Sequence, residues 1–577
     1  MPVTLDAIVN IQKTVWDFLG FKDQTPIKFV QRQGAYVKIE NGAAWIGGSC
    51  ISEYGRAFAL YAQYVSEGIK KCEIFQKPSF QECGVMIETS LNTALRPAAI
   101  KTCINHMAML GMNFFLFSFA WGRTWTAGKY TEEELTDLAH YAASLGIEMV
   151  PCISVQPADN IQFGWKNEKE SGYISSDWND EIFLQQLLCV LRRCFCSKRI
   201  YIKVVPPEKY AAEEYMELDD GKQIEAMQAL LWKLYQKSIY HGLSPVLWAD
   251  PLVPSEKQML LYDDFTKAAQ EYKLDTAMTM ICANGSSAVQ KDFSKKILAY
   301  SKQNVFVSLA SGEKICRSFL PDCKQMIQEA IPALDFSVRK GINTVFAVIR
   351  MTGECTADFM YFLPYLMAYS EYCYAGIGTA EEKIYEMSRF FLKREKKEIE
   401  YFSFFQKRKG TELIWCDPFV RLFHNEEELK KTKEMFQQAY QYFSSRTEEE
   451  RDEYAALLFK VAKEKCELCQ NLFSAYYIGD RNYLWLVAED LIPRLQSDYE
   501  ELHHVHKQLW RKNCMTYGWE ILDGKYGAMH ARLASAGESV WAYLNEEIPQ
   551  IEELTEKGRP EQNQNFLPAL SGFYYMN

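Results

Sequence analysis

The sequence predicts an α/β chain built around a (β/α)8 TIM barrel, with a small N-terminal α/β domain before it and a C-terminal α-helical domain after it. Short apolar runs alternate eight times with amphipathic helical stretches between about residues 83 and 372, and after residue 376 the pattern is helical only. Parallel strands need crossover helices, and eight such units close most simply into a barrel, which leaves no exposed strand edge. We therefore predict domains at residues 1–78, 79–375 and 376–577.

The first 78 residues carry three local signals. Residues 35–39 alternate between apolar and polar side chains, Asn41-Gly42 is typical of a tight hairpin turn, and residues 52–66 have helical spacing. These signals predict a small α/β domain.

The barrel region is predicted from signals for the starts and ends of helices as well as from its apolar runs. Thr131 followed by Glu134 forms a capping-box signature at a helix start, and Gly146 and Gly242 mark helix ends. The predicted strands are residues 84–87, 113–118, 148–153, 200–205, 245–248, 277–282, 305–309 and 344–349. The predicted helices are residues 97–110, 131–145, 180–194, 221–241, 255–272, 288–301, 321–340 and 357–372.

The remaining chain predicts a bundle of long helices at residues 381–392, 426–443, 447–473, 483–509 and 513–545. Glu427 and Lys431 are four residues apart, which supports a solvent-facing helix surface. His503, His504 and His506 have no obvious acidic co-ligand nearby in the sequence, so we expect them on a solvated face. Long helices of this kind also make a homodimer a hypothesis.

Charge and composition exclude several classes of function. The chain has 64 Lys and Arg against 75 Asp and Glu, a net charge of −11, without a basic block, so we expect no nucleic acid as main partner. The first residues lack an export signal, and the most apolar run, residues 107–122, is too short to span a bilayer. We expect a reduced, cytoplasmic protein without a membrane partner.

The predicted active site lies at the carboxyl ends of the barrel strands, as in other barrels of this kind. Polar residues that directly follow the apolar runs are therefore the candidates, and carboxylates among them suit glycoside hydrolysis, which needs an acid and a second carboxylate. The candidates with charge include Glu88, Arg123, Glu208, Asp250, Arg350 and Glu354, and also Asp159 and Glu313.

Several segments resemble glycoside hydrolase family 20, the β-N-acetylhexosaminidases. Residues 82–94, Glu-Cys-Gly-Val-Met-Ile-Glu-Thr-Ser-Leu-Asn-Thr-Ala, followed by Met-Leu-Gly-Met-Asn at 109–113, look like the family's first barrel unit. Residues 130–135 and 141–151 are similar to its next segments, and Pro-Val-Leu-Trp-Ala-Asp at 245–250 to its fifth strand. Residues 526–533 and 551–554 resemble the last helices of a bacterial branch with a C-terminal helical domain. The resemblance covers nearly the whole chain.

The resemblance implies a catalytic pair at the end of the fourth strand. In active members a Glu protonates the leaving oxygen, and the preceding Asp orients the substrate's acetamide, which is the nucleophile. Here the segment from Tyr201 reads Tyr-Ile-Lys-Val-Val-Pro-Pro-Glu, so Val205 and Pro206 occupy the pair's positions. Glu208 is the remaining candidate acid, with Asp250 in support.

The sugar-binding positions implied by the resemblance are also altered. Leu91 stands where the family branch has a sugar-binding Arg, and most of its aromatic wall positions hold other residues. Trp248 is the main surviving wall residue, and Trp121 or Trp125 is a candidate substitute. We therefore expect substrate contacts from Glu88, Arg123, Trp121, Trp248, Arg350 and Glu354, and neither a metal nor a cofactor.

Two functional hypotheses remain open. The first is a β-N-acetylhexosaminidase-like carbohydrate-active protein for terminal N-acetylhexosamine or related sugars, with a degenerate catalytic pair and a small carbohydrate as its ligand. The second is a catalytically silent pseudoenzyme that binds a glycan or a protein. Because Arg123, Lys203 and Arg350 follow or end predicted strands, an anionic sugar is a further hypothesis for the ligand.

Overall fold

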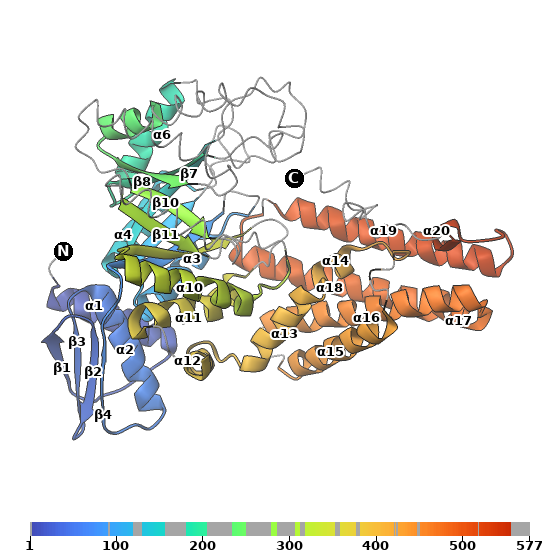
Figure 1. The fold of residues 1–577 in the computed structure, drawn as a ribbon, viewed down its shortest axis with the longest axis horizontal. Coiled ribbons are helices and arrows are strands. Elements are labelled where there is room, and N and C mark those ends of the chain that lie inside the picture. Colours follow the sequence, from blue (N-terminus) through green and yellow to red (C-terminus); the bar gives the residue numbers. More distant parts are fainter. Residues whose placement is uncertain are drawn as a thin grey trace. The chain divides into compact units, whose positions relative to one another are not determined.

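The computed structural model describes fourteen parts of the chain, which fall into two compact units (Figure 1). The barrel unit comprises Met1–Cys316, Cys323–Thr352 and Phe362–Lys396, and the helical unit comprises Arg317–Asp322, Gly353–Tyr361 and Lys397–Asn577. The described residues are 3–89, 93–118, 130–155, 181–204, 233–249, 279–284, 306–311, 318–351, 358–376, 381–420, 422, 425–446, 450–516 and 518–555. The proposed boundaries after residues 78 and 375 stay predictions.

The barrel unit begins with a four-stranded sheet in the order β1-β3-β2-β4. The predicted hairpin joins β2 to β3, and both Asn41 and Gly42 have positive φ, of 53° and 71°, as such a turn requires. Helix α2 packs on one face of the sheet. The bounds are α1 (Leu5–Leu19), β1 (Ile27–Gln31), β2 (Ala35–Glu40), β3 (Ala43–Gly48), α2 (Ile51–Ser66) and β4 (Cys72–Gln76).

A buried charge network attaches α2 to the barrel. Arg56 on α2 forms an ion pair with Glu371, and its Nε donates to Gln76 over 2.7 Å. The guanidinium also donates to Ser370 over 3.1 Å and lies 4.4 Å from the ring of Tyr374. Arg56 and Glu371 are 1% and 0% exposed. Because a buried charge without its partner is costly, this pair requires that α2 packs correctly against the barrel.

The predicted barrel is confirmed: eight parallel strands close in the order β10-β11-β12-β5-β6-β7-β8-β9. Each predicted strand agrees with an observed one to within about two residues at either end. Short apolar runs therefore sufficed to place all eight. Their bounds are β5 (Glu82–Glu88), β6 (Phe114–Ser118), β7 (Glu148–Val155), β8 (Arg199–Val204), β9 (Ser244–Ala249), β10 (Thr279–Asn284), β11 (Phe306–Ser311) and β12 (Thr344–Arg350).

Side chains fill the middle of the barrel. The rings of Phe114, Tyr201 and Phe346 meet there, with centroids 5.6 to 6.3 Å apart. Gly84 lets β5 approach the backbone of β6 closely, since a Cβ at that position would lie 1.7 Å from the carbonyl oxygen of Phe114. The barrel is consequently a packed core, with its two ends available for polar side chains.

The helices around the barrel confirm the sequence signals wherever they are described. Thr131 and Glu134 form the predicted capping box, with reciprocal hydrogen bonds of 3.1 and 2.8 Å. Of the predicted helices at residues 221–241, 255–272 and 288–301, the structure describes residues 233–241 alone. The described helices are α3 (Pro97–Leu110), α4 (Glu132–Ser144), α6 (Glu181–Cys194), α10 (Cys323–Lys340), α11 (Leu363–Ala375) and α12 (Glu381–Leu392), with the 3-10 turn η5 (Phe359–Phe362) before α11.

The helical unit consists of long helices, as predicted, but two of its details differ from expectation. The helix expected over residues 483–509 is interrupted by a π-helical turn, and His506 is fully buried, so its placement on a solvated face was wrong. The bounds are α13 (Lys396–Lys407), α14 (Gly410–Trp415), α15 (Glu426–Ser444), α16 (Glu450–Ile478), α17 (Arg481–Leu486), η6 (Val487–Leu491), α18 (Ile492–Asn513), α19 (Trp519–Leu544) and α20 (Glu552–Thr555).

The described residues contain neither a membrane-spanning helix nor a metal-binding cluster. None of the helices described is both long and apolar enough to cross a bilayer. Within the same parts of the chain, no group of three or more His, Cys, Asp or Glu side chains is arranged to hold a metal ion.

Candidate functional site

The candidate site is the end of the barrel formed by the carboxyl termini of the strands. Glu88 is the last residue of β5, and its register partners are Ser118 on β6 and Arg350 on β12. The backbone N–H of Thr89 donates to the carbonyl of Ser118 over 2.9 Å, and that of Met351 donates to the carbonyl of Glu88 over 3.1 Å. These bonds continue the sheet beyond the strand ends and fix the position of Glu88.

The polar groups at these strand ends are buried. Glu88 is 1% exposed, Ser118 is 0% and Ser311, at the end of β11, is 1%. The hydroxyl of Thr89 donates to the carbonyl of Ser118 over 3.0 Å, and the hydroxyl of Tyr365 donates to the carbonyl of Ser311 over 3.1 Å. A buried carboxylate is costly unless charged or hydrogen-bonding groups compensate it, so Glu88 marks a polar environment inside this end of the barrel.

The strand pattern explains why Glu88 and Ser118 lie in the barrel. Side chains alternate across a strand, and Met86 on β5 and Leu116 on β6 belong to the apolar cluster that fills the barrel. Glu88 and Ser118 are two residues further along the same strands, so they continue the same inward face at its carboxyl end. Ser118 was not among the predicted residues, because those follow the apolar runs, whereas Ser118 is the last inward position within a run.

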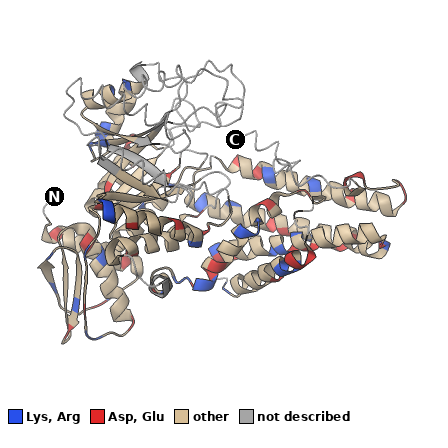
Figure 2. Cartoon of the chain, viewed as in Figure 1, with Lys and Arg blue, Asp and Glu red and all other residues tan. Residues whose placement is uncertain are grey.

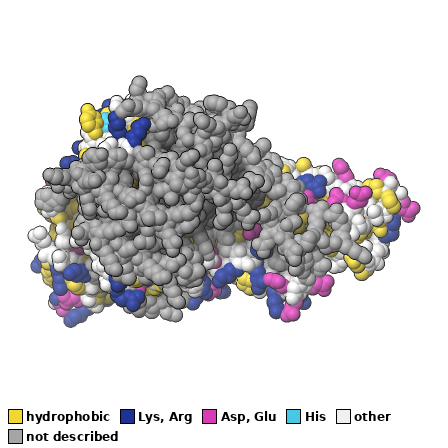
Figure 3. All heavy atoms as spheres, turned by 45° about the horizontal axis from the view of Figure 1, so that its top comes forward, with side chains coloured by type: hydrophobic (Ala, Val, Ile, Leu, Met, Phe, Trp, Pro, Cys, Tyr) yellow, Lys and Arg dark blue, Asp and Glu magenta, His cyan; other side chains and the backbone are white. Residues whose placement is uncertain are grey.

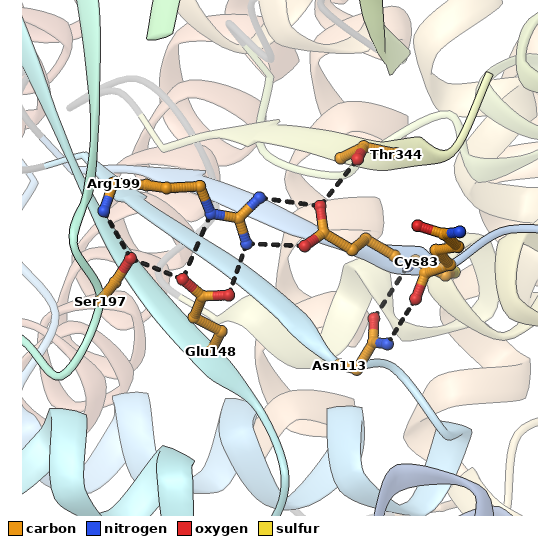
Figure 4. A network of polar contacts seen from close by, with 8 residues as sticks. Cys83, Asn113, Glu148, Ser197, Arg199 and Thr344 are labelled. Carbon is orange, nitrogen blue, oxygen red and sulfur yellow. Dashed lines mark hydrogen bonds and ion pairs between the residues drawn. The ribbon is translucent and has the colours of Figure 1, made fainter. Parts of the chain in front are cut away.

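The opposite end of the barrel carries an ion network (Figure 4). Arg199, at the start of β8, donates from Nη1 and Nη2 to both carboxylate oxygens of Glu82, over 2.9 and 2.7 Å. It also donates from Nε and Nη2 to Glu148, over 3.2 and 2.5 Å. Thr344 and Ser197 donate to the same two carboxylates, over 2.7 and 2.6 Å. These residues open four different strands or lie beside them.

The charges of this network are mutually compensated. Burial alone would lower the pKa of Arg199, but its hydrogen bonds and ion pairs with Glu82 and Glu148 outweigh that effect and raise it. Arg199 therefore stays ionised at neutral pH, and its donors are matched by the carboxylate acceptors of Glu82 and Glu148. Groups at the amino ends of barrel strands typically stabilise the fold, whereas those at the carboxyl ends carry function. We assign the Arg199 network to stability.

The structure describes only part of the predicted set of site residues. Glu88 lies at the carboxyl end of its strand, as expected. Trp248 is in β9 and Arg350 is in β12, and their side chains lie outside the described part of the structure. The other predicted residues also lie outside it: Glu208, Asp250, Arg123, Trp121, Trp125, Asp159, Glu313 and Glu354. Their roles stay predictions, and so do the replacements at Val205 and Pro206.

Comparison with known proteins gives a family match for a segment in the C-terminal part of the chain. Residues 405–567 match the family model described as the glycoside hydrolase 20C C-terminal domain. This match confirms the predicted resemblance to glycoside hydrolase family 20. A search of curated proteins finds no match.

Solved structures similar to this chain include several hexosaminidases. The chitobiase of Flavobacterium johnsoniae is 12% identical, with a TM-score of 0.47, and the match covers 99% of this chain and 93% of that one. A mutant β-hexosaminidase of Streptomyces plicatus is 12% identical, with a TM-score of 0.49 and coverage of 68% and 90%. An exo-β-N-acetylglucosaminidase of Vibrio harveyi is 15% identical, with a TM-score of 0.45 and coverage of 70% and 74%.

Proposed function

From the premise that residues 405–567 form a glycoside hydrolase 20C C-terminal domain, we propose that this chain is a carbohydrate-active protein of the β-N-acetylhexosaminidase type. Its barrel binds a terminal N-acetylhexosamine or a related sugar at the carboxyl ends of the strands. Because Val205 and Pro206 can neither protonate a leaving group nor polarise an acetamide, the protein recognises the sugar without the family's usual hydrolysis. The family match carries this proposal, and the closed barrel with Glu88 at its carboxyl end supports it.

The proposed roles follow from the chemistry of each side chain. Glu88 accepts hydrogen bonds from sugar hydroxyls, and Trp248 offers an apolar ring to one face of the sugar. Arg350 and Arg123 would bind an acidic substituent on the sugar, because guanidinium groups pair with carboxylates through two parallel hydrogen bonds. Trp121 and Glu354 complete the proposed binding set.

Binding is tested by thermal unfolding of the full chain with N-acetylglucosamine or N-acetylgalactosamine. A ligand at one hundred times its dissociation constant stabilises the folded state by about 2.7 kcal/mol, so we expect a measurable rise in melting temperature. Glu88→Gln should reduce this rise. Glu133→Gln, on the exposed start of α4, is the matched control and should leave it unchanged. A parent protein that no N-acetylhexosamine stabilises would contradict the proposal.

Hydrolysis by Glu208 is the alternative, since this carboxylate lies two residues beyond the position of the family's acid. The test measures release of nitrophenol from an N-acetylglucosaminide and an N-acetylgalactosaminide, with Glu208→Gln for comparison. We expect no turnover from either protein. Turnover by the parent that Glu208→Gln abolishes would replace the binding proposal with an active glycosidase that uses Glu208 as its acid.

A further inference from the structure

The small N-terminal sheet has one covered face and one open face. Phe29 on β1 points to the covered side, where its ring contacts those of Tyr54 and Phe58 on α2. Lys28 and Phe75, on the other face, are exposed, Phe75 to 46%. We call this second surface the cationic face and define it by Lys28, Arg32, Tyr36, Lys38, Trp45 and Phe75.

The strand register orders the cationic face in rows. Lys28 on β1, Trp45 on β3 and Lys38 on β2 are direct register partners, so they form one row across the sheet. The ammonium groups of Lys28 and Lys38 each lie 5.5 Å from the centroid of the Trp45 ring. Cation–π attraction therefore holds a positive charge on either side of one indole.

A third cation lies next to this row. The guanidinium of Arg32 lies 4.6 Å from the ring of Tyr36 and 4.4 Å from that of Phe75. Tyr36 and Phe75 are themselves register partners on β2 and β4. Two neighbouring rings thus hold one guanidinium, which reduces the entropy that Arg32 would lose when it binds an anion.

Two of these cations are available for an external partner. Lys38 forms an ion pair with Glu40 over 2.9 Å, and Tyr36 donates to Glu73 over 2.9 Å. Lys28 and Arg32, in contrast, form no ion pair with any residue that the structure describes. Their positive charges are partnered by rings, which leaves them free to bind carboxylate or sulfate groups from solution.

The charge of this domain contrasts with that of the whole chain. Residues 1–78 contain nine Lys and Arg against seven Asp and Glu, whereas the whole chain has a net charge of −11. Figure 2 shows Lys and Arg on strands of the small sheet, and the lower left of Figure 3 shows Lys and Arg mixed with hydrophobic side chains and with Asp and Glu. A positive region on an acidic protein favours an acidic partner.

We propose that the cationic face binds an acidic polysaccharide, such as a polyuronate, at a site separate from the barrel. Lys28 and Lys38 lie on β1 and β2, on either side of β3, and Arg32 follows β1, so the cations are spread over the face, which suits a flat polymer with regularly spaced carboxylates. The exposed edges of the rings provide apolar contacts for the sugar faces. The choice of a polysaccharide over single-stranded nucleic acid rests on the proposed function, since a second sugar-binding surface would keep a polymer close to the barrel.

The test measures binding of the full chain to sodium polygalacturonate by isothermal titration calorimetry, at low and at physiological ionic strength. We expect binding that weakens as salt rises, because the contacts are between charges. The double variant Lys28→Glu with Arg32→Glu should bind about tenfold more weakly. The matched control is Lys430→Glu with Lys431→Glu on α15, which changes the net charge equally and should bind as the parent does.

Four results would overturn the proposal. They are no binding of polygalacturonate by the parent, equal loss in the two double variants, tighter binding of oligothymidylate than of polygalacturonate, and equal binding of neutral dextran. If the variant with two Glu residues fails to fold, Lys28→Ala with Arg32→Ala replaces it in the test. This variant removes the two positive charges without introducing negative ones. The monosaccharide and nitrophenol assays report on the barrel alone. Failure of polygalacturonate binding can therefore be distinguished from failure of the proposed function of the barrel.

Discussion

The barrel and the helical unit both bury titratable side chains, but they compensate them differently. In the barrel, Arg199 keeps its charge because Glu82 and Glu148 surround it with matched acceptors. In the helical unit, His506 stays neutral at neutral pH because burial among aromatic rings lowers its pKa to about 3. A charged network with matched partners therefore resists changes of pH near neutrality, whereas an uncompensated buried group makes its surroundings pH-sensitive.

The largest effect is expected from breaking the barrel network. Arg199→Met leaves Glu82 and Glu148 beside each other without their cation, and unpaired buried charges are costly. Because the side chain is 25% exposed, we expect a loss near the lower end of the usual range, about 3 kcal/mol in the free energy of unfolding. Urea unfolding of the full chain measures this loss.

Arg193→Met is the matched control for the barrel network. Arg193 forms an exposed ion pair with Glu132 at 2.9 Å, and such pairs contribute about 0.5 kcal/mol. Sugar-induced stabilisation should survive in both variants, because the network lies at the opposite end of the barrel from Glu88. Equal losses in the two variants, or loss of sugar binding with Arg199→Met, would contradict the assignment of this network to stability.

The second prediction concerns His506. Its Nδ1 lies 3.0 Å from the hydroxyl of Tyr526, and the rings of Phe319, Tyr454 and Trp519 surround it. His503 adds a smaller lowering of its pKa. The unfolded chain binds a proton below about pH 6.5 and the folded chain does not, so stability falls as the pH falls from 6.5 towards 3.

The slope of this fall is about 1.4 kcal/mol for each pH unit. His506→Phe removes the titrating group. The free energy of unfolding of the variant minus that of the parent should therefore be about 2 kcal/mol higher at pH 5 than at pH 7.5. Tyr526→Phe, the control, removes the hydrogen bond and keeps the histidine, so its cost should be similar at both pH values. Parallel stability curves for the parent and His506→Phe would contradict the prediction.

The sequence predicted the barrel better than the small domain, for a physical reason. Buried parallel strands are continuous apolar runs, so all eight were recognisable. Strands β1 and β4 alternate apolar residues with Lys, Gln and Glu, because one of their faces is open, and they were missed together with α1. Helices α13 and α14 were missed as well.

The site was less predictable than the fold because it depends on distant contacts. Glu88 directly follows an apolar run, and the structure places it at the carboxyl end of β5, as expected. Arg199 and its partners lie 51 to 117 positions apart, and only closure of the barrel brings them together. His506 was placed on a solvated face because periodicity shows which residues share a face of a helix and not which neighbours cover that face.

The smallest effect is expected at Glu464 on α16. Its carboxyl is buried and shares a hydrogen bond with Asp498, and these two causes raise its pKa to about 7. Lys463 and Arg494 lie 3.7 and 3.4 Å from it and act in the opposite direction, while Lys460 forms an ion pair with Asp498 at 2.6 Å. The folded chain therefore holds a proton here that the unfolded chain releases near pH 4.5, and this stabilisation is lost as the pH rises towards and above 7.

Glu464→Gln replaces this proton with a permanent amide donor to Asp498. We expect the variant to be about 1 kcal/mol more stable than the parent at pH 8, with a smaller difference at pH 5, where the parent's carboxyl is protonated. Asp490→Asn is the matched control, since Asp490 forms an exposed i,i+4 pair with the same Arg494. Urea unfolding at the two pH values measures both. If Glu464→Gln were equally destabilising at pH 5 and pH 8, Glu464 would be an ordinary ion-pair partner, and the contrast between the two units would rest on His506 alone.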